Sequence, residues 1–89
     1  MPIVSFTSAL RRFLDAPPAE VAGGTVSEAL AAVFAERPAL RGYVLDDQGA
    51  LRRHVAVYID GKAVRDRIKL SDPIGADDDI YVFQALTGG

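Results

Sequence analysis

With 89 residues the chain is long enough for one domain with a small core, and a second domain does not fit. It contains no cysteine, which excludes disulfides, thiolate metal sites and cysteine nucleophiles. The formal net charge of −2 argues against a nucleic-acid-binding protein, because phosphate contacts need a basic surface. No window approaches the roughly 18 apolar residues of a membrane span and no signal-peptide pattern is present, so a cytoplasmic protein is expected.

The first residues predict a β-strand. Residues 2–7 place Val4 and Phe6 on one side and Ile3 and Thr7 on the other, which is the two-residue period of a half-buried strand. One face of this strand is therefore expected to contact the core.

A break follows the first strand. Residues 8–15 are typical of a short helical turn or an ordered loop, and Pro17-Pro18 ends any helix there. Residues 19–22 predict a short second strand, with Gly23-Gly24 as the turn after it. The two strands are expected to pair as a wide hairpin.

A helix is predicted from Thr25 onward. Thr25 and Glu28 have the spacing of a capping box, in which the Thr25 hydroxyl accepts from the Glu28 N–H and the Glu28 carboxylate accepts from the Thr25 N–H. Apolar residues then recur at helical spacing and form one stripe: Val26, Ala29, Leu30, Val33 and Phe34. Pro38 ends the helix.

The second half of the chain predicts three further strands. After one more helical turn that packs Leu40, Tyr43, Val44 and Leu45, and a turn at 46–49, residues 55–59 alternate as a strand. Asp60-Gly61 suits a tight hairpin into a short strand at 62–64, and the last strand covers 80–85.

The order strand, strand, helix, strand, strand, strand predicts an α+β fold. The helix can act as a crossover, so that the first and last strands lie parallel at the centre of a mixed sheet of about five strands. One main helix covers one face only. The alternation then places Tyr58, Tyr81 and Phe83, with Ile3 beside them, on the uncovered face. Such a patch favours a protein-docking surface, although rings that shield one another across strands would give the same pattern.

Catalytic constellations are scarce. His54 is the only histidine and lies beside two arginines, which is typical of an ordinary surface residue. The acidic run Asp77-Asp78-Asp79 lacks the spacing of a calcium loop, so no metal is expected. The acidic run and the basic run 62–69 have two interpretations. Each is either a solvated loop or a charged surface that steers a partner. No glycine-rich phosphate loop is present, so we expect no bound cofactor, and any ATP is bound by a partner.

The strongest signal is the pair Gly88-Gly89 directly behind the last predicted strand. Because glycine has no Cβ, this segment can pass through a narrow channel against another protein's backbone and deliver a carboxylate to a remote active site. Four residues reach at most about 13 Å when extended. Residues 86–89 are therefore predicted to form a tail on a single domain that spans residues 1–89.

The hairpin, the Thr25-capped helix, the run 51–61 with Ile59-Asp60-Gly61, the acidic loop and the Gly-Gly end together resemble the ThiS/MoaD family of sulfur-carrier proteins. The resemblance covers essentially the whole chain. It implies the ubiquitin-like β-grasp fold and a protein cosubstrate rather than an enzyme. The two prolines between Asp15 and Ala19 depart from a typical hairpin turn.

By this resemblance, the Gly89 carboxylate is adenylated by a ubiquitin-activating-like enzyme with ATP and converted to a thiocarboxylate. Leu86, Thr87 and Gly88 would be the threaded tail, and Ile3, Tyr58, Tyr81 and Phe83 would dock the activating enzyme and a sulfur-accepting enzyme. The long segment 38–53 resembles the molybdopterin synthase small subunit or the cysteine-pathway carrier more than the shorter thiamine-pathway carrier. Of these two we rank first the molybdopterin subunit, whose acceptor is the synthase large subunit. The alternative is a ubiquitin-like modifier or binding module that is conjugated to lysines through Gly89.

Overall fold

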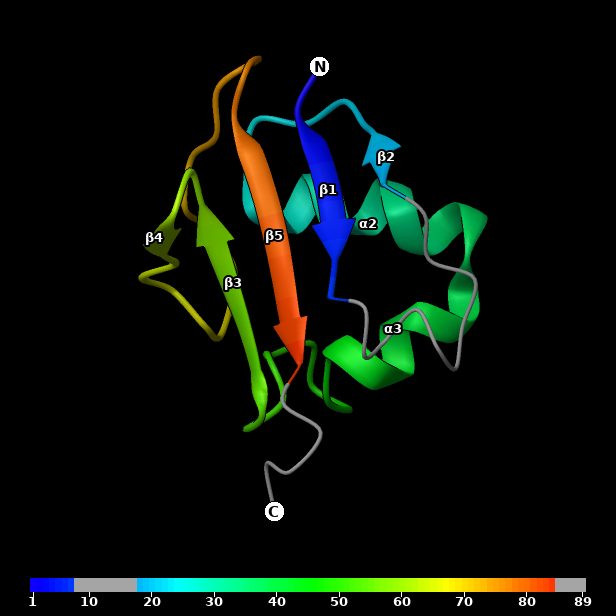
Figure 1. The fold of residues 1–89 in the computed structure, drawn as a ribbon. Coiled ribbons are helices and arrows are strands. Elements are labelled where there is room, and N and C mark those ends of the chain that lie inside the picture. The colour runs from blue at the N-terminus through cyan, green and yellow to red at the C-terminus, as the bar shows by residue number, and fades with distance from the viewer. Residues whose placement is uncertain (8–17, 85–89) are drawn as a thin grey trace.

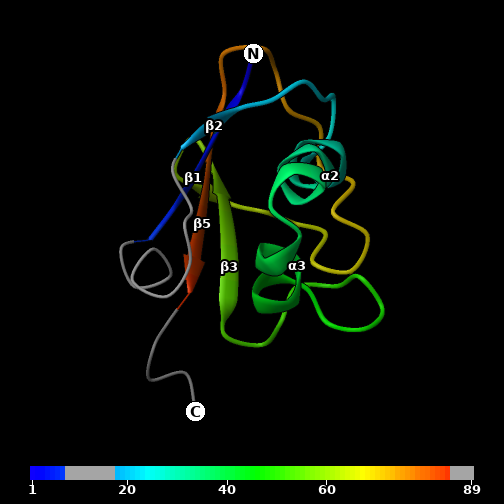
Figure 2. The same ribbon diagram turned by 90° about the vertical axis from the view of Figure 1, so that its right-hand side faces the viewer.

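The structure, a computed structural model, describes residues 1–7 and 18–84. Five strands form one sheet: β1 (Ile3–Phe6), β2 (Ala19–Glu20), β3 (Val55–Ile59), β4 (Lys62–Ala63) and β5 (Asp79–Gln84). Two helices, α2 (Val26–Glu36) and α3 (Pro38–Val44), pack on one side of this sheet, as Figures 1 and 2 show. The predictions for residues 8–17 and for Ala85 lie outside the described residues.

The sheet has the strand order β2-β1-β5-β3-β4, so that β5 is the central strand. β1 and β5 are parallel, and the other three pairs of neighbours are antiparallel. The parallel pair is possible because α2 lies in the connection between the N-terminal strands and the later ones, as a crossover. The α+β fold with a mixed five-stranded sheet is therefore confirmed (Figure 1).

The apolar stripe of α2 is buried as its spacing predicted. Val26, Ala29, Leu30, Val33 and Phe34 all join the core, where they meet the inward-pointing residues Val4, Val57, Ile80 and Val82 of the sheet. Thr7, predicted on the opposite side of the first strand, is instead buried, and its backbone N–H donates to the Val82 carbonyl.

The cap of α2 differs from the predicted capping box in one hydrogen bond. The Thr25 hydroxyl accepts from the Glu28 backbone N–H at 3.2 Å, as expected. The Glu28 carboxylate, however, accepts from the Gly24 N–H at 2.7 Å and not from that of Thr25. Thr25 has the extended backbone usual for an N-cap residue and forms an isolated β-bridge with Pro73.

The predicted helical turn after Pro38 is a seven-residue helix. Pro38 ends α2 and also begins α3, where its missing N–H costs no helical hydrogen bond. Leu40, Val44 and Leu45 are buried as predicted, but Tyr43 is exposed because it lies on the outer side of α3.

The segment 65–72, which the sequence did not predict to be ordered, is a tight turn built on two carboxylates. Asp72 accepts from the backbone N–H groups of Arg65 and Asp66, and Asp66 accepts from three backbone N–H groups and the Ser71 hydroxyl. These bonds hold Leu70 in the core at a φ of 55°, a left-handed conformation that is uncommon for leucine.

We expect Asp66→Asn to destabilise the protein most above pH 4. The Ser71 hydroxyl and the backbone amides stabilise the ionised carboxylate and lower the Asp66 pKa from 3.8 to about 2. A lowered folded-state pKa contributes stability above pH 3.8, and that stability is lost as the pH falls toward 2. Urea denaturation between pH 2 and 7 should therefore show wild type and variant converging at acidic pH, with Asp47→Asn as the control. A constant difference across this range would contradict the assignment.

Candidate functional site

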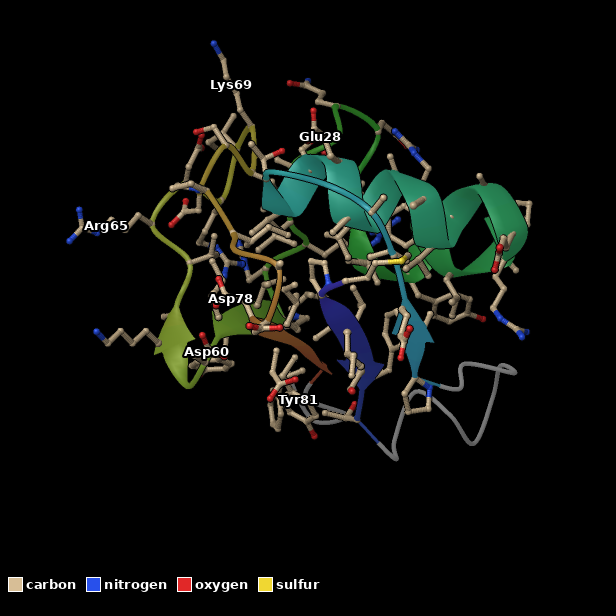
Figure 3. All side chains as sticks on the ribbon, turned by 90° about the horizontal axis from the view of Figure 1, so that it is seen from above. Glu28, Asp60, Arg65, Lys69, Asp78 and Tyr81 are labelled. Carbon is tan, nitrogen blue, oxygen red and sulfur yellow. The ribbon has the colours of Figure 1, made fainter. Side chains whose placement is uncertain are left out.

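The predicted docking residues lie on one face of the sheet. The helices cover the inner face, and strand alternation turns Ile3, Tyr58, Tyr81 and Phe83 to the opposite side, which we call the outer face. Figure 3 shows Tyr81 on the side of the sheet away from α2, whereas Glu28 lies on the α2 side. Ile3 is 36% exposed, Tyr81 41% and Phe83 43%, and Tyr58 is half-buried.

Small residues border the rings of the outer face. Tyr58 pairs directly with Tyr81, but the other neighbour of Tyr81 is Ser5, and Phe83 pairs with Ala56. Among residues 1–7 and 18–84, direct cross-strand pairing of two rings on this face is therefore limited to Tyr58 and Tyr81. Phe83 has only the Ala56 methyl group directly opposite it on β3, and 43% of its side chain is exposed.

The outer face leads directly to the segment that carries the predicted tail. β5 is hydrogen-bonded between β1 and β3 and ends at Gln84. Residues 85–89 follow it in the chain, and Leu86, Thr87, Gly88 and Gly89 lie outside the described residues. The role of Gly89 as the reacting group thus stays a prediction, while the strand that precedes it is the most firmly held in the sheet.

The acidic loop before β5 has a structural role. Asp78 accepts from the Gly75 N–H at 2.7 Å and closes a turn. Asp60, in the β3–β4 hairpin, accepts from the Asp79 N–H at 2.9 Å, and this bond is the main reason that the Asp60 pKa is lowered. Asp60 and Gly61 both have positive φ, as the predicted hairpin requires. The carboxylates therefore hold the beginning of β5 in place.

Other chemistry is sparse in the part of the chain that the structure describes. His54 is exposed, and residues 1–7 and 18–84 contain no group of three histidine, aspartate or glutamate side chains placed to hold a metal ion. No helix within these ranges is long and apolar enough to cross a membrane.

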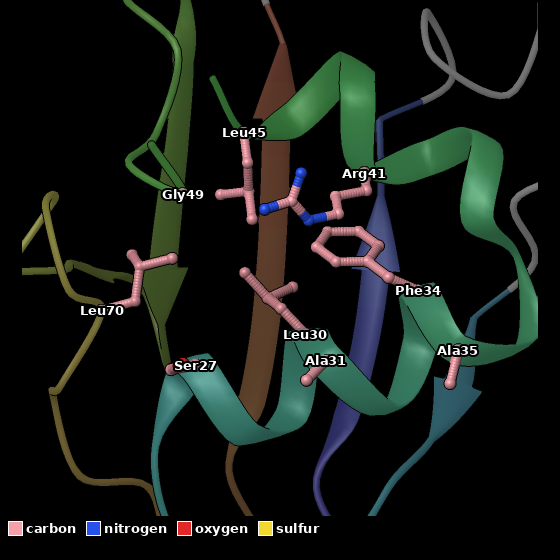
Figure 4. A pocket seen from close by; sticks show the side chains of 9 residues that line it. All are labelled: Ser27, Leu30, Ala31, Phe34, Ala35, Arg41, Leu45, Gly49 and Leu70. Carbon is pink, nitrogen blue, oxygen red and sulfur yellow. The ribbon is translucent and has the colours of Figure 1, made fainter. Parts of the chain in front are cut away.

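A pocket of about 410 Å³ lies on the helix side of the molecule, away from the outer face (Figure 4). Most of its lining residues are apolar and come from α2, with Leu45 and the buried Leu70, while α3 contributes Arg41. Figure 4 shows the Arg41 guanidinium beside the Phe34 ring at this pocket. The lining contains no histidine or carboxylate side chain, so it holds no acid–base pair for catalysis. None of the predicted site residues lines it.

Solved structures with the same fold come from both archaea and bacteria. The crystal structure of SAMP1 from Haloferax volcanii is 27% identical, with a TM-score of 0.78 over 99% of this chain and 98% of that one. A chain of the Amycolatopsis orientalis BexX/CysO complex is 23% identical, with a TM-score of 0.84 over all of both chains. Mycobacterium tuberculosis CysO is 21% identical, with a TM-score of 0.80 over 97% of this chain and 100% of that one.

The curated proteins contain no relative that matches this sequence. A family model does match: the ThiS family model covers residues 8–89, which includes the whole sheet beyond β1, both helices and the Gly-Gly end. This match covers most of the chain and is consistent with the ubiquitin-like fold described above. The chain therefore belongs to the ThiS family.

Proposed function

We propose that the protein is a sulfur carrier whose Gly89 carboxylate is adenylated by a separate ATP-dependent enzyme and converted to a thiocarboxylate. The observation that carries the proposal is the central strand β5, which is held on both sides and leads into a segment that ends in Gly88-Gly89, in a chain of the ThiS family. A held strand positions the tail, and residues without a Cβ let it enter a narrow active site.

The chemistry follows from the poor reactivity of a carboxylate. A Gly89 oxygen attacks the α-phosphorus of ATP, which forms an acyl adenylate and releases pyrophosphate. Hydrosulfide supplied by a donor then attacks the acyl carbon, the new C–S bond replaces the C–O bond to AMP, and AMP leaves, so that the product is the thiocarboxylate. The chain has no glycine-rich phosphate loop, so in this proposal the partner binds ATP and the carrier binds no cofactor.

Intact mass spectrometry tests the proposal. Incubation with the activating enzyme, ATP and a sulfur donor should raise the mass of the protein by roughly 16 Da, the difference between oxygen and sulfur in the acyl substitution. Fragmentation should place the increase at Gly89. If the wild-type protein keeps its mass while a known carrier gains sulfur with the same reagents, the proposal is wrong.

The outer face is the proposed docking surface for the activating enzyme, and Phe83→Asp should weaken that binding by about tenfold or more. Phe83 is exposed opposite Ala56, so aspartate is accommodated in the free protein but brings an unpaired charge into an apolar contact. Calorimetric titration measures the dissociation constant, and Tyr43→Asp, an equally exposed ring on α3, is the matched control. Equal affinities of wild type and Phe83→Asp would remove the outer face from the docking model.

For the sulfur acceptor we favour a molybdopterin synthase large subunit and keep cysteine- and thiamine-pathway enzymes as alternatives. The long segment 38–53 resembles both the molybdopterin synthase small subunit and the cysteine-pathway carrier, and it argues only against the shorter thiamine-pathway carrier. Single-turnover transfer distinguishes them. The thiocarboxylate form is mixed with each purified acceptor in turn, and loss of the 16 Da increment identifies the acceptor that takes the sulfur.

A second function is favoured by the 27% identity to a chain named as a small archaeal modifier protein. In this role the Gly89 acyl group would be transferred to a lysine amine of a target, which forms an isopeptide bond. Conjugates of higher mass that disappear when Gly89 is deleted would support it. Activation by adenylation is common to both functions, so one protein can perform both.

A further inference from the structure

The pocket on the helix side joins parts of the chain that are far apart in the sequence. Four of its lining side chains are apolar and largely buried, with exposed fractions of 1–9%: Leu30 and Phe34 of α2, Leu45 directly after α3, and Leu70 of the 65–72 turn. Figure 4 shows these side chains around one hollow of about 410 Å³. A ligand in this hollow therefore meets hydrocarbon on several sides.

The size of the pocket suits a small molecule. Ligand sites in proteins usually measure about 300–1,000 Å³ and combine apolar walls with a few polar groups. At roughly 30 Å³ per non-hydrogen atom, as in liquid water, a volume of about 410 Å³ holds a ligand of about a dozen such atoms. The lining residues Ala31 and Ala35 are exposed on α2 and carry only methyl groups, so they leave the entrance open.

Arg41 gives the pocket its charge. It is exposed in the last turn of α3, and Figure 4 shows its guanidinium between Leu45 and Phe34. Within the part of the chain that the structure describes, its side chain makes no hydrogen bond or ion pair, and the lining contains no carboxylate that could neutralise it. The nearby Arg52, in contrast, donates from Nε to the Gly42 carbonyl at 2.6 Å. The N–H groups of Arg41 are therefore available to a ligand.

We propose that this pocket binds a small molecule that has an apolar body and a carboxylate. The body contacts Leu30, Phe34 and Leu70, where removal of apolar surface from water stabilises the complex. The carboxylate accepts two parallel hydrogen bonds from the Arg41 guanidinium. Because Arg41 is the only ionised side chain in the described lining, a carboxylate with one negative charge matches the site better than a phosphate monoester, which carries nearly two.

The site is separate from the surfaces that the proposed sulfur chemistry uses. It lies on the helix side of the sheet, so a bound ligand leaves the outer face free for a partner protein (Figure 2). A ligand that binds only the folded protein also stabilises it by mass action. The protein can therefore bind a small molecule and a docked enzyme at the same time.

Titration of the protein with octanoate, followed by NMR of the leucine methyl groups, tests the proposal. The signals of Leu30, Leu45 and Leu70 should shift and saturate with a dissociation constant of about 1 mM or less, as expected for a ligand of this size. The exposed Ile68 does not line the pocket, so its methyl signals should stay in place. Octan-1-ol is the uncharged ligand of the same chain length.

The variant Arg41→Gln tests the charge of the site. It should lower the octanoate affinity by about three- to tenfold and leave the octan-1-ol affinity unchanged, because only the carboxylate uses the guanidinium. The matched control is Arg53→Gln, which removes an exposed arginine outside the pocket. This control should bind both ligands with the wild-type affinities.

The variant Ala31→Leu tests the position of the site. Its larger side chain fills part of the pocket and should weaken the binding of both ligands by about tenfold or more. The matched control is Ala39→Leu, at an exposed position of α3 that does not line the pocket, and it should bind as wild type does.

Saturating shifts at the pocket together with a loss of octanoate affinity alone in Arg41→Gln support the proposal. It is overturned by pocket signals that do not saturate, by equal losses in Arg41→Gln and Arg53→Gln, by equal losses of both ligands in Arg41→Gln, or by unchanged binding to Ala31→Leu. Shifts of the same signals when the protein alone is concentrated would assign the pocket to a second copy of the chain and also overturn it. None of these measurements involves Gly89, so the sulfur-carrier function is decided separately by its mass measurement.

Discussion

Replacing Gly88 by valine is expected to slow adenylation of Gly89 by at least about 100-fold, because a displacement of about 1 Å at a reacting centre already costs that much. A β-branched side chain at position 88 makes the tail stiffer and bulkier. In the proposed complex, position 88 lies close to the backbone of the activating enzyme, where glycine has no side chain to clash. Gly88 follows the last residue of the sheet, Gln84, so the fold should not change. Pyrophosphate release in the presence of the activating enzyme and ATP measures adenylation.

The matched control for this variant is Gly75→Val. Gly75 lies in the loop before β5 with a negative φ, and a Cβ there would be 3.6 Å from the Asp78 carboxylate, which is ordinary contact. This variant should be adenylated at the wild-type rate, and urea denaturation should show that both proteins stay folded. Full adenylation of Gly88→Val would mean that the tail is not the reacting segment.

Ile80→Ala should lower the free energy of unfolding by about 2–5 kcal/mol, which is a large part of the roughly 5–15 kcal/mol of a small domain. Ile80 is 1% exposed in the central strand, in register with Val4 on one side and Ile59 on the other. Removing its outer carbons leaves a cavity in the layer where the sheet meets α2, and the hydrogen-bonded strands prevent that layer from collapsing.

Ile68→Ala removes the same atoms from a side chain that is 68% exposed, so it should change the free energy of unfolding by less than about 0.5 kcal/mol. Urea denaturation followed by circular dichroism measures both variants. If the two substitutions cost the same, the central position assigned to β5 is wrong.

Local patterns predicted most of the elements because their causes lie within a few residues. The buried stripe of α2 is predictable from helical spacing of apolar residues, and the β3–β4 hairpin from two adjacent residues that tolerate positive φ. The β5 strand is predictable from its apolar run. The crossover rule then ordered the strands. The same local reasoning assigned the outer face, because alternation places Tyr81 and Phe83 opposite the core once the helix side is known.

The reacting group of the proposed carrier, Gly89, is a prediction from the sequence by itself, made from residue type and position behind a strand. The tertiary structure decided which residues far apart in the chain are neighbours. The position of Ile3 between Glu20 and Asp79 depends on the pairing of three strands, and the buried Leu70 depends on two carboxylates that close its turn. No local pattern contains this information, because register and turn closure are set by the packing of the whole sheet and its core.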